Sequence, residues 1–304
     1  MSLRYSESTY LDRAHDFDRF CVWKYPDETT LTEPIVLNWL KTHRSNQGNI
    51  IHAMVTFARS FGRYQCAVGK EAFVISEKFT TGRSIFVPYL FTDGELENLF
   101  QEIDCLTPKR DPLASMVLST YFRMTYTCGL RPGEGRNIRR TEVDLNSGEL
   151  RIVDSKRHRS RTVVMSDDMT ALARSYAAMR DAARPDSEYF FPTQNGGPYT
   201  AAWMQGKFKK AFAASKPDVP KDLLPSVRVY DLRHRFATAI LNRWLDEERD
   251  LSSRLSYLQA YMGHKQLEAT AYYIHLLPEN LVKSAGIDWE SIGRILPRAE
   301  LWCE

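Results

Sequence analysis

The stretch VYDLRHRFAT, residues 229–238, carries both a helical core pattern and a cluster of positive charge. Leu232 and Phe236 are four residues apart, which is the spacing of side chains on one buried face of a helix. Tyr230 and Arg233 are three residues apart, so they are neighbours on a helix surface. An arginine anchored in this way is well placed to bind a phosphate, although a helix with an exposed basic face shows the same pattern.

Two segments downstream hold further polar side chains, LQAYMGH at residues 258–264 and TAYYIH at residues 270–275. The first follows a helical stripe that ends at a glycine, and His264 directly after it can donate a hydrogen bond to an oxyanion. The second contains Tyr272 and Tyr273, and a phenol is either a packing group or a nucleophile. Taken alone, both segments fit a protein core better than a site.

The segment GLRPGE, residues 129–134, predicts a helix end at which an arginine is held in a turn. Gly129 is a typical helix stop, and Pro132 keeps the helix from continuing through Arg131. A guanidinium fixed there can bind a phosphate through two hydrogen bonds, and Glu134 is placed to orient it. A helix end with a surface ion pair is the alternative interpretation.

A basic turn lies between two short segments with the composition of β-strands, residues 149–154 and 161–165. Its sequence SKRHRSR, residues 155–161, holds four lysines and arginines within six residues. The tip of such a hairpin could reach a phosphate backbone, and Lys156 among the other cations could serve as a general acid. A solvated charged turn is the alternative.

The rest of the chain is mostly helical in pattern. Three apolar stripes, the first from about residue 8 to 23 and the third from about residue 46, predict a helical bundle whose buried faces include Leu11 and Ile50. Residues 77–88 break this pattern and predict a linker. The sequence TDGE, residues 92–95, has the spacing of a capping box and predicts the start of a second helical part.

Composition limits the class of protein without choosing a function. With 304 residues the chain has room for one large domain or two ordinary ones. The net charge of +3 does not by itself indicate a nucleic-acid partner, so the local basic clusters must carry that inference. Five scattered cysteines, none in a C-x-x-C pair, favour free thiols in a cytoplasmic protein over zinc or disulfides. No apolar run approaches the ~20 residues that span a membrane.

Together, the polar residues of the quoted segments fit one chemistry. Phosphoryl transfer in DNA needs an in-line nucleophile, positive donors on the non-bridging oxygens and a proton for the leaving hydroxyl. A tyrosine, two arginines, a histidine and a lysine provide these parts without a metal ion.

In this combination the sequence resembles the tyrosine recombinase family of site-specific DNA recombinases, also called the phage integrase family. The resemblance covers roughly residues 90–278 and rests on the order and spacing of the motifs. Lys156 lies five residues before Arg161, and Tyr273 lies nine residues after His264, as in the family. The matching catalytic positions are Arg131, Lys156, Arg233, His264 and Tyr273, and Tyr230 stands where the family usually has histidine.

The resemblance implies a mainly α fold with a small antiparallel β-sheet, in two domains. Residues 1–87 would form a helical, SAM-like core-binding domain that contacts DNA and ends in the linker at about residues 77–88. Residues 88–304 would form the tyrosine-recombinase catalytic domain, with a C-terminal tail at about residues 279–304. That tail would either dock on a neighbouring protomer or fold back on its own domain.

The resemblance also implies a mechanism. Tyr273 would attack the scissile phosphate, form a 3′-phosphotyrosyl bond and release a 5′-hydroxyl. Arg131 and Arg233 would hold the non-bridging oxygens with help from His264, and Lys156 would protonate the leaving oxygen. Because the protein–DNA bond keeps the energy of the bond that was broken, no cofactor or metal ion is expected.

The expected partner is double-stranded DNA, on which the protein would assemble as a homo-oligomer, expected to be a tetramer. Glu134 is expected to orient the catalytic groups from behind them. Cations from both domains are expected to contact the DNA: Lys41, Arg44, Arg59, Arg63, Arg157, Arg159 and Arg161.

Tyr230 is the one departure from the family pattern that bears on activity. A phenol donates a hydrogen bond to a phosphate oxygen but does not exchange protons near neutral pH as an imidazole does. We therefore expect an active enzyme in which Tyr230 is a donor. The alternatives are a DNA-binding protein of the same fold that has lost catalysis, an enzyme that relaxes DNA like a type IB topoisomerase, and a helical interaction module.

Overall fold

The computed structural model describes residues 7–43, 48–79, 87–108, 111–154, 159–247 and 249–276. The chain divides into two compact units between Val87 and Pro88, and each unit has its own hydrophobic core. Helices dominate both units, and a small antiparallel sheet lies in the second. The predicted fold class, mainly α with a small antiparallel sheet, is confirmed.

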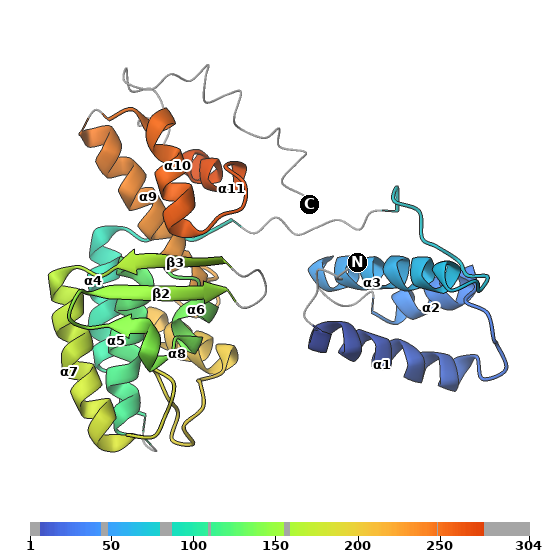
Figure 1. The fold of residues 1–304 in the computed structure, drawn as a ribbon, viewed down its shortest axis with the longest axis horizontal. Coiled ribbons are helices and arrows are strands. Elements are labelled where there is room, and N and C mark those ends of the chain that lie inside the picture. Colours follow the sequence, from blue (N-terminus) through green and yellow to red (C-terminus); the bar gives the residue numbers. More distant parts are fainter. Residues whose placement is uncertain are drawn as a thin grey trace. The chain divides into compact units, whose positions relative to one another are not determined.

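The N-terminal unit contains the helices α1 (Glu7–Lys24), α2 (Glu33–Thr42) and α3 (Gly48–Ala67), drawn in shades of blue in Figure 1. The three predicted helical stretches are therefore present. Two residues of the predicted apolar stripes are not buried, since Leu11 is 48% exposed and Ile50 is 45% exposed. In a bundle this small, each helix covers only a narrow stripe of its neighbours.

Trp39 on α2 joins the three helices of this unit. Its side chain is fully buried, and its ring lies 4.9 Å from Phe17 on α1 and 5.7 Å from Phe57 on α3, both in edge-on contact. The indole N–H donates to Asp16 at 3.0 Å, so the polar end of the buried ring is also satisfied.

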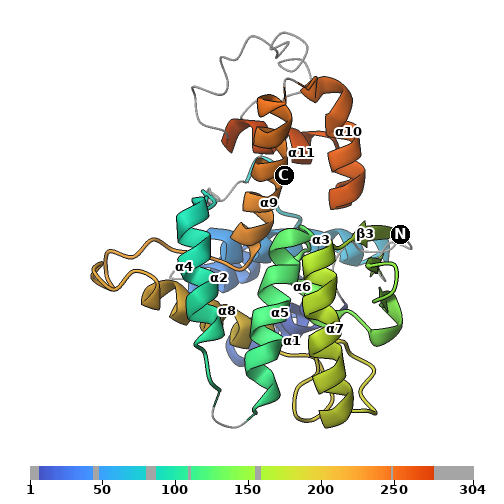
Figure 2. The same cartoon turned by 90° about the vertical axis from the view of Figure 1, so that its left-hand side faces the viewer.

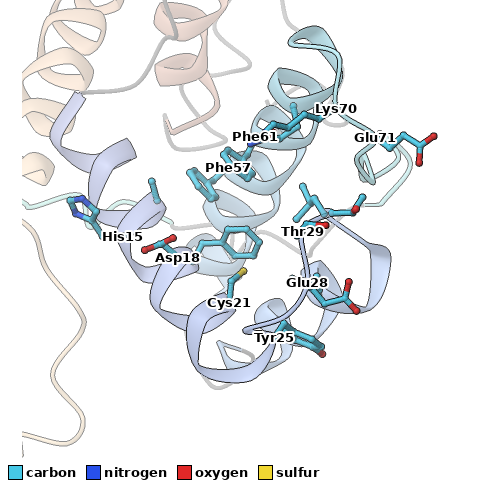
Figure 3. A pocket seen from close by; sticks show the side chains of 16 residues that line it. His15, Asp18, Cys21, Tyr25, Glu28, Thr29, Phe57, Phe61, Lys70 and Glu71 are labelled. Carbon is cyan, nitrogen blue, oxygen red and sulfur yellow. The ribbon is translucent and has the colours of Figure 1, made fainter.

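A cavity of about 510 Å³ opens among these helices and the loop that follows α1 (Figure 3). The stacked rings of Phe57 and Phe61, 5.9 Å apart, line it on the α3 side. The carboxylates of Asp18, Glu28 and Glu71 also line it, so its charge disfavours an anion such as a DNA phosphate. The chemistry predicted from the sequence lies instead in the second unit.

The second unit begins with α4 and is built around α5. Its elements are α4 (Asp93–Asp104), α5 (Leu113–Thr127), α6 (Pro132–Asn137), η1 (Arg140–Glu142), β1 (Val143–Asp144), β2 (Glu149–Asp154), β3 (Arg159–Val164), α7 (Asp167–Ala183), α8 (Ala201–Ala214), α9 (Tyr230–Asp246), α10 (Leu251–Met262), α11 (Glu268–Ala271) and η2 (Tyr272–Leu276). Figure 2 shows α4, α5 and α7 side by side, and α5 packs against both of the others and against α9.

The first turn of α4 has the predicted capping box. The hydroxyl of Thr92 accepts a hydrogen bond from the backbone N–H of Glu95 at 3.3 Å. The Glu95 carboxylate in turn accepts from the backbone N–H of Thr92 at 2.9 Å. This exchange satisfies two backbone donors that the helix itself leaves free and fixes where the second unit starts.

The predicted hairpin is present, with one strand more than expected. β2 pairs antiparallel with β3 from Glu149 opposite Val164 to Asp154 opposite Arg159, and the short β1 adds to the other edge of β2. β3 begins two residues earlier than predicted. The tip with Lys156 and Arg157 lies outside the described residues, as do Arg44 and the predicted tail at 279–304.

Helix α9 passes from one core cluster of this unit to another. Leu232 belongs to the main cluster, whereas Ala237 and Leu241 pack with α10 and η2 in a second one. Figure 1 shows α9 leading from the sheet and helices toward α10 and α11. Because both clusters hold α9, its first turns, which carry Tyr230 and Arg233, are fixed in position.

Removing the Thr92 hydroxyl tests whether the capping box stabilises the second unit. We expect Thr92→Ala to lower the free energy of unfolding by about 1 kcal/mol, because the backbone N–H of Glu95 loses its acceptor. Urea denaturation followed by circular dichroism measures the change. Thr107→Ala, at an exposed threonine outside a helix, is the control and should be near neutral. Equal stability of both variants would exclude a stabilising cap.

Candidate active site

Arg233 is the buried centre of the site. Its side chain has no exposed surface. One terminal nitrogen donates to the carbonyl of Gly129 at 2.6 Å, and the other donates to the carbonyl of Met262 at 2.5 Å and contacts Nε2 of His264 at 3.0 Å. Arg233 therefore connects the first turn of α9 with the ends of α5 and α10.

Glycine makes both helix ends possible. Gly129, after α5, has a φ of +58°, and Gly263, after α10, has a φ of +64°. A Cβ on Gly129 would lie 2.4 Å from the ring of Phe236, and one on Gly263 would lie 2.9 Å from the guanidinium of Arg161. Only glycine fits these positions without movement of the neighbours, so both predicted helix stops are also points of close packing.

Arg131 lies beside this centre and still reaches solvent. Its guanidinium donates to Glu134 and to the carbonyl of Gly263, each at 2.7 Å. Tyr230 lies close enough to Arg131 for the two side chains to interact electrostatically. With 34% of the side chain exposed, Arg131 can present N–H groups to an anion that approaches from outside.

Glu134 holds the arginines in place. Its carboxylate accepts from Arg131 at 2.7 Å and from both terminal nitrogens of Arg161 at 2.9 and 2.7 Å, and it lies 3.9 Å from Arg233. Burial alone would favour its neutral form, but the hydrogen bonds and charges of Arg161 and Arg131 hold the pKa of Glu134 at about 2. Glu134 therefore contacts the arginines of the site, and its role in orienting them for catalysis stays a prediction.

Arg161 differs from the expectation of a cation that faces DNA. Its side chain is only 14% exposed, and besides Glu134 it binds the carbonyl of Tyr261 at 2.8 Å. It therefore ties β3 to α10 and to the acidic residue behind the site. The sequence places Arg161 in a charged turn but does not show that the strand turns this side chain inward.

His264 is held between Arg233 and Thr270. An arginine only donates, so Nε2 of His264 is the acceptor at 3.0 Å, and Nδ1 is left to donate to the Thr270 hydroxyl at 2.8 Å. Burial, followed by the nearby charges of Arg233, Arg131 and Arg161, lowers the pKa of His264 to about 3. In this structure the neutral ring orients Arg233, whereas the sequence suggested a donor to an oxyanion.

Tyr273 lies against these groups in η2 and is only 2% exposed. Its ring stacks on His264 with centroids 6.0 Å apart. Burial raises the pKa of its hydroxyl to about 12, although the nearby charge of Arg233 acts in the opposite direction. Tyr272 is more exposed, so of the two tyrosines Tyr273 is the one held at the arginines.

His234 is a member of the site that has no expected role from the sequence. Its ring centroid lies 5.0 Å from that of Tyr230 and 5.6 Å from that of Tyr273. The side chain is 8% exposed. In the sequence, a histidine next to Arg233 looks like any other basic residue of the stretch, and only the packing of η2 onto α9 brings it to Tyr273.

Two of the N-terminal residues that were expected to contact DNA bind other groups of the protein. Arg59 donates to the carbonyls of Ile75 and Ser76, and Arg63 pairs with Glu77 at 2.6 Å. Lys41 is exposed and donates to the side chain of Asn38 on its own helix at 3.4 Å. In the second unit, the side chain of Arg159 lies outside the described part of the structure.

Comparison with known sequences places this arrangement among DNA recombinases. The model of the phage integrase family matches residues 91–280. An inferred integrase/recombinase of Sinorhizobium fredii, y4rE, is 32% identical over 64% of this chain and 62% of its own length, so the chain spans less than two thirds of that relative. A second one from that organism, y4rB, is 28% identical over 85% of this chain and 84% of its own length. The tyrosine recombinase XerC of Proteus mirabilis is 29% identical over 57% and 52%.

Solved structures show the same fold. The XerH recombinase bound to its difH substrate after cleavage superposes with a TM-score of 0.66 at 16% identity, over 93% of this chain and 79% of that one. The integrase of transposon Tn1549, in complex with transposon right-end DNA, gives 0.64 at 15% identity over 97% and 95%. A λ integrase dimer on a core site gives 0.61 at 14% identity over 90% of each chain.

The carboxylate of Glu134 makes a testable contribution to stability. Because its pKa in the folded protein is below its ordinary value of 4.5, this contribution is complete above that value and is lost as the pH falls toward 2. We expect Glu134→Gln to lower the free energy of unfolding by about 3 kcal/mol at pH 7. The difference between variant and wild type should shrink below pH 5. Denaturant titrations at several pH values measure it, and a difference that does not depend on pH would contradict the assignment.

Proposed function

Since the chain belongs to the phage integrase family, we propose that it cleaves and rejoins specific DNA sites through a 3′-phosphotyrosyl intermediate with Tyr273 as the nucleophile. The observation that carries this proposal is the meeting of Arg131, Arg233, His264 and Tyr273 around one buried point, from four separate parts of the chain. No metal-binding cluster of His, Cys, Asp or Glu accompanies them within the described residues.

The arginines would stabilise the charge of the reacting phosphate. Arg131, which is partly exposed, would bind a non-bridging oxygen first, and Arg233 would bind the other once the DNA enters. Their positions are fixed in advance by Glu134 and by backbone carbonyls, so little reorganisation is needed in the transition state. Tyr230, at the edge of Arg131, would donate its hydroxyl hydrogen to the same phosphate.

The leaving group needs a proton, for which we propose Lys156. In the sequence Lys156 falls between β2 and β3, outside the described residues, and β3 is anchored to the site because Arg161 binds Glu134. A lysine near several cations loses its proton more readily, which suits a general acid near neutral pH. The 5′-hydroxyl of a partner strand would reverse both transfers and rejoin the DNA.

We propose double-stranded DNA as the partner and a tetramer on DNA as the working assembly. Each of the two units would contact DNA phosphates, and the N-terminal unit would contribute Lys41 to these contacts. The names of the XerH, Tn1549 and λ structures state that those proteins were bound to DNA. Binding through phosphates should weaken steeply as salt rises.

Covalent trapping tests the nucleophile. We expect wild type and Tyr272→Phe to form a protein–DNA adduct on nicked suicide duplexes drawn from a random-sequence library, because a strand lost from the nick cannot rejoin. Tyr273→Phe should form none, since it lacks the attacking oxygen. Gel separation under denaturing conditions measures the adduct. An adduct that survives in Tyr273→Phe would contradict the assignment, and its absence from wild type would favour a DNA-binding protein without catalysis.

Lys156 can be tested through the leaving group. We expect Lys156→Ala to slow adduct formation by about 100-fold or more on ordinary DNA. A substrate with sulfur in place of the bridging 5′-oxygen should restore the rate, because a thiol with a pKa of about 8.5 leaves without an acid. Rates on the two trapped substrates measure this. A variant equally slow on both substrates would show that Lys156 does not protonate the leaving group.

A further inference from the structure

We propose that His234 accepts the proton of the Tyr273 hydroxyl when DNA is cleaved and returns it when the strand is rejoined. This inference rests on the proposed function, in which Tyr273 is the nucleophile. The reaction needs a base, and Tyr230, at the position where the family usually has histidine, does not provide one. The inference assigns this role to His234.

His234 lies among the tyrosines of the candidate site. His234 lies one helical turn after Tyr230 on α9 and directly follows Arg233. Its ring is surrounded by the three tyrosines of the site, with centroids 5.0 Å from Tyr230, 5.6 Å from Tyr273 and 6.4 Å from Tyr272. An imidazole is therefore present beside the nucleophile, displaced by one turn from the place where the sequence pattern led us to expect it.

One ring nitrogen of His234 has no hydrogen-bond partner among the described residues. The His234 side chain is 8% exposed, and its Nδ1 is buried with no hydrogen-bond partner among the described residues. A buried polar atom without a partner costs about 1–3 kcal/mol, so such atoms are uncommon unless they serve a function. In the neutral ring a nitrogen that does not carry the proton can accept one.

The other candidate acceptors nearby are already engaged. Both nitrogens of His264 have partners, since Nε2 faces Arg233 and Nδ1 faces Thr270. The Glu134 carboxylate is bound by two arginines. Asp231 is fully buried, and one of its carboxylate oxygens accepts from the backbone N–H of Arg228 at 2.8 Å. Its other oxygen has no hydrogen-bond partner among the described residues but lies 3.6 Å from the guanidinium of Arg228, with which it forms an ion pair.

The electrostatic setting is consistent with this role. Burial, followed by the charges of Arg228 and Arg233, lowers the pKa of His234 to about 4, so the ring is neutral at neutral pH, although the same shift makes it a weaker base than a free imidazole. Burial raises the pKa of Tyr273 to about 12, so its hydroxyl does not ionise without help. The negative charge of a bound phosphate would stabilise the imidazolium that forms.

The proton balance is closed by two residues. In cleavage, the Tyr273 oxygen forms a bond to phosphorus while its proton moves to His234. The bond from phosphorus to the 5′-oxygen breaks, and that oxygen takes a proton from Lys156. In rejoining, Lys156 takes the proton of the attacking 5′-hydroxyl, and His234 returns its proton to the departing tyrosine oxygen.

The test uses the full chain on the trapped suicide duplex. His234→Gln keeps the size and hydrogen bonding of the side chain but cannot accept a proton, so we expect adduct formation to slow by about 100-fold or more. It should stay slow on the sulfur-bridged substrate, because the defect lies at the nucleophile and not at the leaving group. Added imidazole should speed adduct formation by His234→Ala at least tenfold. His15→Gln, at an exposed histidine of the N-terminal unit, is the matched control and should react like wild type.

The results that would contradict the role of His234 differ from those that would contradict the proposed function. A His234→Gln variant as fast as wild type would overturn the proposal, and so would rescue of that variant by the sulfur-bridged substrate. A slow His234→Ala that imidazole does not accelerate would assign the ring a packing role instead. If wild type itself formed no adduct, the proposed function would fail and this inference with it, whereas a defect confined to the His234 variants leaves the proposed function intact.

Discussion

The structure of the second unit depends on one buried charge, the guanidinium of Arg233. A charge without exposed surface needs partners that compensate it, and here the carbonyls of Gly129 and Met262 accept from the two terminal nitrogens, while Nε has no hydrogen-bond partner among the described residues. Those carbonyls become available because two helices end at glycines with positive φ. Glu134 compensates the charge from 3.9 Å and binds Arg131 as well. The same contacts that make the charge tolerable therefore bring the chain segments of the site together.

The elements that sequence predicts well are those set by local chemistry. The capping box at Thr92, the helix stop at Gly129 and the core stripe of α9 each follow from a few neighbouring residues, and the structure has all of them. The family resemblance indicated which distant residues belong to one proposed site, because it reflects contacts between distant segments that periodicity does not show. The strand β1 is only two residues long, too short to leave a pattern.

What sequence does not show is how distant segments share partners. Arg233 and Gly129 are 104 residues apart, and Arg161 and Tyr261 are 100 apart. The sequence of a charged turn is the same whether the side chain of Arg161 faces DNA or Glu134. The packing of the hairpin against α10 decides its direction. The same holds for His234, whose neighbours come from η2. Exposure of Leu11 likewise depends on how much of α1 the small bundle covers.

The groups of the candidate site hold one another in place within the protein, and Tyr273, the proposed nucleophile, is covered. Glu134 and backbone carbonyls occupy the arginines, and Tyr273 is buried beside His264 and His234. A phosphate would take over part of these hydrogen bonds. The most direct measurement of this account is the identity of the residue joined to DNA, read by mass spectrometry of the DNA-linked peptide from a trapped adduct. The account predicts that the DNA is attached to Tyr273, and attachment to Tyr272 or Tyr230 would contradict it.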